Sequence, residues 1–173
     1  MGIEKLLEEL VRHEGGFVNH PSDPGGATKF GITEATLSHW RKQSVTEADV
    51  KALTVDEAKA IYTQLYYLTP KINQLSPILQ PIIFDMAVNM GTVQAIKIAQ
   101  RVFSKLGTPL VCDGVIGEKT LISAKAACNV QGHTEVIRNI VNARINFYCE
   151  LVAKQPEKQV FLDGWKNRAN DFL

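Results

Sequence analysis

Two carboxyl side chains near the N-terminus have contrasting settings that suit acid–base chemistry. Glu14 continues the apolar stripe of Leu7 and Leu10, and it ends an amphipathic segment directly before two glycines. Burial and the negative end of a helix dipole both favour the protonated form of a carboxyl group there. Asp23 instead lies in a glycine-rich loop, where backbone N–H groups favour the ionised form. One protonated and one ionised carboxyl group are what hydrolysis of a glycosidic bond requires.

Two further side chains of the same loop suit such a site, although ordinary structural roles fit this segment as well. The hydroxyl of Thr28 can orient a water molecule, and His20 is another titratable group within reach. A glutamate at a helix end is often only solvated, and the sequence Asp-Pro-Gly-Gly is often only a turn. The chemical interpretation therefore rests on the conjunction of the stripe, the Gly-Gly stop and the Asp-bearing loop.

The elements around this segment are expected to be helices. Threonines begin several of the helical patterns: Thr33 as an N-cap, Thr54 in a capping box with Glu57, and Thr92 as a further cap. Prolines and glycines between residues 17 and 32 exclude a helix there and predict a loop, with room for two short β strands. The predicted helices run from Ile3 to residue 13 or 14, from Thr33 through Trp40, from Thr54 through about Leu68, over Ile82–Val88, from Thr92 to about Leu106, from the turn at Asp113–Gly117 to about Cys128, from about Thr134 to Lys154, and around Phe161–Asp171. The predicted fold is mainly α, with a small glycine-rich loop or β-hairpin after the first helix.

The composition bounds the class of protein. The chain of 173 residues suffices for one hydrophobic core, with at most a small appended subdomain, and 45% of its residues are hydrophobic. The 19 Lys and Arg against 18 Asp and Glu leave a net charge of +1, which disfavours nucleic acid as a partner. Three widely spaced cysteines predict reduced, buried thiols and no structural metal. No apolar run is long enough to span a membrane, and the acidic, amphipathic start is unlike a signal peptide, so a soluble chain made in the cytoplasm is expected.

The motif segment resembles the signature of the glycoside hydrolase family 108 muramidases. The resemblance rests on His13–Val18 (HEGGFV) and Asp23–Thr33 (DPGGATKFGIT). Phe84–Gly91 (FDMAVNMG) is similar to that family's Asp-x-x-Val-Asn-x-Gly helix. Asp113–Gly117, with Thr120–Leu121, resembles its C-terminal peptidoglycan-binding portion. The likeness covers nearly the whole chain.

The resemblance implies a lysozyme-like helical fold and a lysozyme activity of the EC 3.2.1.17 type. That activity hydrolyses the β-1,4 bond between N-acetylmuramic acid and N-acetylglucosamine, and the family's catalytic glutamate falls on Glu14. Phage-type lysozymes use a Glu, an Asp and a Thr in this order, which points to Asp23 and Thr28, although Thr28 comes somewhat early for that pattern. Phe17 stands where the family commonly has Tyr, so this position is expected to pack and not to bind.

Several other polar and aromatic residues are candidates for binding the sugar chain. Asp85 and Asn89 are spaced i, i+4 on an apolar helix, which fits either a buried polar network or a sugar contact. Tyr62 and Tyr66 have the same spacing and either stack on sugar rings or pack into the core. The predicted substrate-binding set is His20, Lys29, Tyr62, Tyr66, Asp85 and Asn89.

The expected organisation is a catalytic region over residues 1–91 and a helical peptidoglycan-binding-like region over residues 92–173, packed on it as one compact unit. We expect a monomer without cofactor, metal, nucleic acid or membrane insertion, acting on peptidoglycan glycan strands. It would reach the periplasmic wall through a holin or a secretion apparatus. Phage lysis as an endolysin and a secretion-associated role both fit.

Three alternatives remain. A lytic transglycosylase can use the same glutamate, and a non-catalytic wall-binding module would keep the groove without a working acid. The segment Gly31–Lys42 resembles the second helix of a helix-turn-helix, but the glycine-rich loop stands where the partner helix should be. Inversion or retention of the anomeric centre depends on the separation of the two carboxyl groups.

Overall fold

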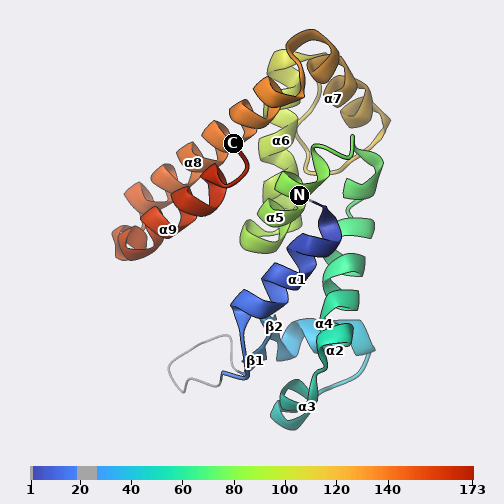
Figure 1. The fold of residues 1–173 in the computed structure, drawn as a ribbon, viewed down its shortest axis with the longest axis vertical. Coiled ribbons are helices and arrows are strands. Elements are labelled where there is room, and N and C mark those ends of the chain that lie inside the picture. The colour runs from blue at the N-terminus through green and yellow to red at the C-terminus, as the bar shows by residue number, and fades with distance from the viewer. Residues whose placement is uncertain (1, 19–26) are drawn as a thin grey trace. The chain divides into compact units, whose positions relative to one another are not determined.

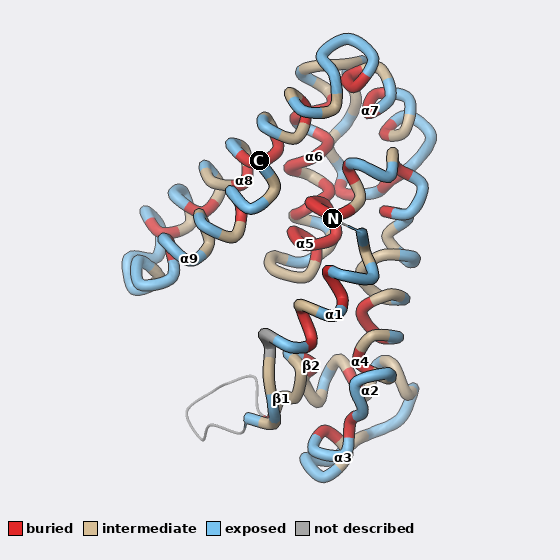
Figure 2. Tube along the Cα trace, viewed as in Figure 1, coloured by how far each residue is buried: buried red, intermediate tan, exposed pale blue. Residues whose placement is uncertain are grey.

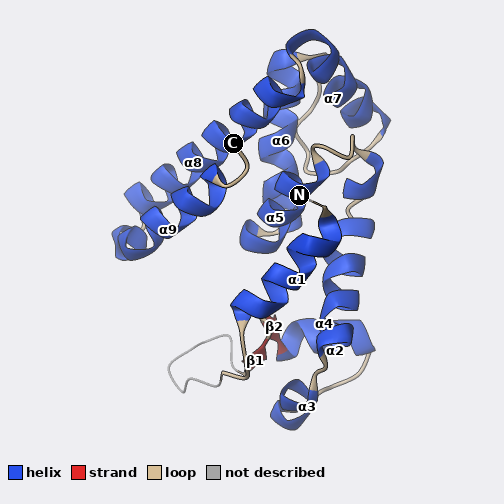
Figure 3. Cartoon of the chain, in the orientation of Figure 1, coloured by secondary structure: helices blue, strands red, loops and turns tan. Residues whose placement is uncertain are grey.

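The computed structural model describes residues 2–18 and 27–173, except for the side chains of residues 13 and 14. Helices make up most of this part of the chain, and the strands are confined to one short hairpin, as Figures 1 and 3 show. The mainly α prediction is therefore confirmed. The chain forms two compact units, Met1–Tyr66 and Tyr67–Leu173.

In the first unit, α1 (Ile3–Glu14) forms because its apolar residues recur on one face. Leu7, Leu10 and Val11 are buried on that face, and α1 packs against α4 (Val55–Tyr62). The helix ends where Gly15 takes a positive φ of 68°, a conformation that side chains with a Cβ atom disfavour. The predicted end at residue 13 or 14 is thus confirmed.

The two predicted strands are present as an antiparallel hairpin. Strand β1 (Thr28–Lys29) pairs with β2 (Ile32–Thr33), with Thr28 opposite Thr33. Phe30 and Gly31 form the tight turn, both with positive φ. This hairpin stands directly before α2 (Glu34–Arg41), in the place that a helix-turn-helix would give to a helix.

Threonine caps organise the next helices, with three differences from prediction. Thr33 caps α2 by accepting the N–H of Thr36, as expected. Thr54 accepts the N–H of Glu57, but the Glu57 carboxylate pairs with Arg41 and does not return to the cap, so the predicted capping box is only half formed. The helix after Thr54 changes at residue 63 into a π-helical stretch, η1 (Thr63–Leu68). A further helix, α3 (Glu47–Ala52), was not predicted, and a complete capping box begins it.

The second unit is built around α6 (Thr92–Leu106), which packs against α5 (Gln80–Met90), α7 (Glu118–Gln131) and α8 (His133–Lys154). Figure 2 shows α5 buried over most of its length, whereas much of α9 (Gln159–Asn170) is exposed. Two short helical segments complete the unit, η2 (Ile72–Gln74) and η3 (Pro156–Lys158). No helix in the described part of the chain is long and apolar enough to cross a membrane.

Two smaller expectations were wrong in this unit. Gly91 is the N-cap of α6, and Thr92 is its first residue, without a side-chain cap. Of the cysteines, Cys128 is buried, but Cys112 is half-buried and Cys149 is exposed on α8. The three thiols are free, as expected.

Candidate active site

Backbone hydrogen bonds join the end of α1 to the hairpin. The carbonyl of Gly15 accepts the N–H of Phe30 at 3.2 Å. Val18 and Thr28 exchange two backbone hydrogen bonds, each 2.8 Å long. Glu14 is therefore the last residue of α1, and the next residue, Gly15, is hydrogen-bonded to the hairpin. The backbone is thus held on both sides of Glu14.

Two predicted catalytic residues and one predicted binding residue lie wholly or partly outside the described part of the structure. Glu14 is the last residue of α1, but its side chain lies outside the described atoms. His20 and Asp23 lie outside the described residues. Their roles stay predictions.

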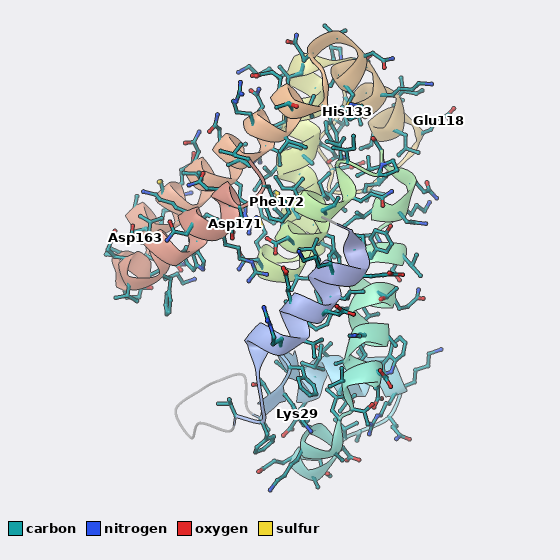
Figure 4. The ribbon with its side chains drawn as sticks, viewed as in Figure 1. Lys29, Glu118, His133, Asp163, Asp171 and Phe172 are labelled. Carbon is teal, nitrogen blue, oxygen red and sulfur yellow. The ribbon has the colours of Figure 1, made fainter. Side chains whose placement is uncertain are left out.

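Strand β1 carries Thr28 and Lys29, both half-buried. The Nζ atom of Lys29 donates to the carbonyl of Lys51 at 2.7 Å and lies 5.3 Å from the centre of the Phe30 ring. Lys51 is in the last turn of α3, where carbonyls lack helical partners and attract a cation. Lys29, labelled in Figure 4, therefore links β1 to α3, and a substrate contact would have to share its ammonium group.

The two candidate tyrosines sit at the change from α4 to the π-helical stretch. Tyr62 is only 3% exposed, and its hydroxyl donates to the carbonyl of Phe30 at 2.8 Å. Tyr66 is half-buried, and its ring centre lies 5.4 Å from that of Tyr62. Tyr62 therefore has a packing role and holds the hairpin turn in place, while sugar stacking by either ring stays a prediction.

An ion-pair cluster holds the three short helices of this unit together. Arg41 on α2 makes a two-pronged contact with Glu57 on α4, at 2.9 and 2.8 Å, and reaches Asp49 on α3 at 3.4 Å. The hydrogen bond from Arg41 lowers the pKa of Glu57. Hydrogen bonds from Thr46 lower the pKa of Asp49. Arg41 is thus a structural residue that was not singled out as one, because the three helices meet only in the fold.

In the second unit, Asp85 lies in a buried network. Its carboxylate pairs with Arg144 at 2.7 Å and with Arg168 at 2.8 Å. The Nε atom of Arg144 donates to the hydroxyl of Tyr148, and that hydroxyl donates to Asn89. Asp85 is 7% exposed and Arg144 is 0% exposed, and burial raises the pKa of Tyr148. The contacts fit the network alternative for Asp85 and Asn89, and their contact with sugar stays a prediction.

A second polar centre forms the turn at Asp113–Gly117. The amide nitrogen of the buried Gln100 donates to Asp113 at 2.9 Å, and its amide oxygen accepts the N–H of Gly114 at 2.8 Å. The bond from Gln100 lowers the pKa of Asp113. Gly114 has a φ of 85°, and a Cβ atom there would come within 2.7 Å of Val93. These contacts account for the turn as a structural element.

Beside the end of α1 lies a hollow of about 320 Å³ that sequence analysis did not identify. Residues spaced i, i+3, i+4 and i+7 line one side of it, and the opposite side comes from the hairpin turn and α4. The helical spacing of the four residues on the α1 side was the signal available in the sequence. The lining residues are Glu8, Val11, Arg12, Gly15, Phe30, Val55 and Lys59.

Comparisons with known proteins agree with this architecture. The family described as Glycosyl hydrolase 108 matches residues 7–91, and the family described as "Predicted Peptidoglycan domain" matches residues 94–170. The solved structure of Brucella abortus SagA is 32% identical and has a TM-score of 0.74, with 98% of this chain and 94% of that chain covered. No curated protein sequence matches the chain significantly. The chain belongs to the glycosyl hydrolase 108 family, and it is a peptidoglycan-degrading glycosidase.

Proposed function

We propose that this glycosidase is an N-acetylmuramidase and that Glu14 is its general acid. The observation that carries the proposal is the position of Glu14 as the last residue of α1, directly before the backbone link between Gly15 and Phe30. A general acid must be held at a fixed distance from the oxygen that it protonates. A helix end fastened to a hairpin supplies such a rigid support.

In the proposed reaction, the Glu14 carboxyl group gives its proton to the glycosidic oxygen that leaves N-acetylmuramic acid. A water molecule, oriented by the Thr28 hydroxyl, forms the new bond to the anomeric carbon and passes its proton to the Asp23 carboxylate. The bond between the anomeric carbon and the leaving oxygen breaks as the new one forms. Products are a reducing N-acetylmuramic acid end and a free 4-hydroxyl group on N-acetylglucosamine.

Mass spectrometry of the fragments released from purified peptidoglycan tests the cleaved bond. A muramidase leaves reducing N-acetylmuramic acid ends. Reducing N-acetylglucosamine ends would instead identify a glucosaminidase, and 1,6-anhydro ends would identify a lytic transglycosylase. Either of those outcomes would overturn the proposed bond or the proposed water attack, while the assignment to a peptidoglycan-degrading glycosidase would stand.

We also propose that the enzyme works as a monomer on the periplasmic wall, after passage through a holin-type pore or a dedicated apparatus. The support is the substrate itself, because peptidoglycan lies outside the cytoplasmic membrane. Expression in a bacterial cytoplasm should leave the cells intact, and co-expression of a holin should lyse them. Lysis of equal speed without a holin would contradict this route, and light scattering of the purified chain measures its oligomeric state.

A further inference from the structure

The second unit contains a cavity of about 330 Å³ that the proposed chemistry does not use. One face of α7 lines it, opposite the turn that precedes α5, and His133 closes one end at the first residue of α8. Figure 4 labels His133 at this end of α8, beside α7. The hydroxyl of Ser76 and Nε2 of His133 lie 3.1 Å apart, so a hydrogen bond joins the turn before α5 to the start of α8. The volume is near the lower limit of small-ligand sites.

The floor of the cavity is aliphatic. Leu75, Leu79 and Ala124 are at most 4% exposed, and Cys128 is 8% exposed. Burial raises the pKa of the Cys128 thiol, which keeps it neutral and apolar. Among the described residues that line the cavity there is no Phe, Tyr or Trp, and the His133 ring lies at one end and not in the floor. Such a floor suits small methyl-bearing groups and lacks the flat ring faces on which sugars stack.

The rim of the cavity favours an anion. The amine of Lys125 is exposed at its edge, and α8 begins at His133 without a side-chain cap. The first N–H groups of a helix lack partners within it and point towards an anion. No acidic residue is among the described lining residues. Glu135, the acid in the first turn of α8, accepts hydrogen bonds from Arg138 and Asn139.

We propose that this cavity binds the peptide stem of peptidoglycan through the free carboxylate at the end of the stem, which Lys125 and the start of α8 attract. The proposal rests on the assignment of peptidoglycan as the substrate. In peptidoglycan the free carboxylates belong to the peptide stems, and their alanine methyl groups match the aliphatic floor. The enzyme would then hold the stem in its second unit while the glycan bond is cut elsewhere.

Titration of the full chain with two synthetic stem peptides ending in D-Ala-D-Ala tests the proposal. One peptide has a free C-terminal carboxylate, and the other has a C-terminal amide. The free acid should bind on the order of three- to tenfold more tightly, as expected for one charge contact near a helix start. Lys125→Glu should abolish this preference. The matched control Lys119→Glu changes another exposed lysine of α7 that does not line the cavity, and it should keep the preference.

Thiol alkylation locates the bound peptide. The free-acid peptide should slow alkylation of Cys128, in the floor, and leave the exposed Cys149 unaffected. Absence of peptide binding, equal affinity for both peptides, or unchanged Cys128 reactivity would overturn the inference. If the enzyme releases wall fragments but does not bind the stem peptide, the cavity proposal is wrong and the muramidase proposal stands. If it binds the stem peptide but releases no wall fragments, the muramidase proposal is wrong and the cavity stays a binding site.

Discussion

The end of α1 and the network around Asp85 hold polar residues in opposite ways. At the end of α1, main-chain groups of Gly15 and Phe30 make the link between helix and hairpin. Around Asp85, the side chains bind one another, with Arg144 at the centre. A frame built from main-chain bonds fixes a position without using its side chain. In a network of charged side chains, each group is already bound to another group of the network. Removal of any one of them destabilises the fold, because it leaves a buried partner without its contact.

This difference predicts where substitutions act. Changes at the end of α1 should alter activity with little effect on stability. Changes in the Asp85 network should alter stability first, because a buried charge would lose its partner. Four substitutions test that contrast.

The largest effect is expected for Glu14→Gln, which keeps the size of the side chain and removes the acid. We expect peptidoglycan hydrolysis to fall about 10²- to 10⁴-fold, the usual contribution of general acid–base catalysis. Dye release from labelled peptidoglycan measures the rate, and pull-down with insoluble walls measures binding, which should persist. The matched control is Glu4→Gln, at an exposed position of the same helix. Undiminished turnover by the Glu14 variant would end its assignment as the acid.

Arg144→Met should cause the largest loss of stability. It leaves the Asp85 carboxylate with Arg168 as its remaining ion-pair partner and Tyr148 without one donor. Loss of one member of a buried pair costs about 3–5 kcal/mol of unfolding free energy. Urea denaturation measures it. The exposed pair of Arg138 and Glu135 supplies the comparison, because Arg138→Met should cost less than about 1 kcal/mol. Equal losses for both variants would contradict the contrast between the regions.

Tyr62→Phe tests the side-chain support behind the hairpin turn. The variant keeps the buried ring and leaves the carbonyl of Phe30 without this donor. We expect a loss of about 1 kcal/mol in unfolding free energy and a modest loss of activity, since the turn is bonded to Gly15. Tyr66→Phe, whose ring contact survives the change, should behave like the parent. An inactive but fully stable Tyr62 variant would instead favour a direct role for its hydroxyl in substrate binding.

The smallest effect concerns the pH dependence of stability at Glu57. The hydrogen bond from Arg41 holds the pKa of Glu57 below its ordinary value of 4.5 in the folded chain. Its contribution is therefore complete above that value and disappears as the pH falls through the lower, folded pKa. Glu57→Gln should be less stable than the parent by up to about 1 kcal/mol at pH 7. The difference should vanish in acid, and a gap that persists at low pH would show that the ion pair is not its cause.

Local patterns were sufficient to predict most of the helices. The apolar spacing of α1 and the glycine at its end predicted where that helix stops, and the caps at Thr33 and Thr54 predicted two helix starts. The short α3 was not predicted because its few residues show too little periodicity. The spacing of Thr46 and Asp49, which form its capping box, was the signal in the sequence that could have indicated it. The π-helical stretch after Tyr62 has no sequence signature of its own.

The sequence by itself determined the mainly α fold and identified the segment around Glu14 as the candidate catalytic segment, because helix periodicity, glycine stops and the motif are all local. It left the partners of Asp85 undecided. Only the tertiary structure brought Arg144 and Arg168 to that carboxylate, since they come from helices far along the chain. The sequence also did not predict the cavity at Ser76 and His133, because its walls are separate segments that only packing brings together.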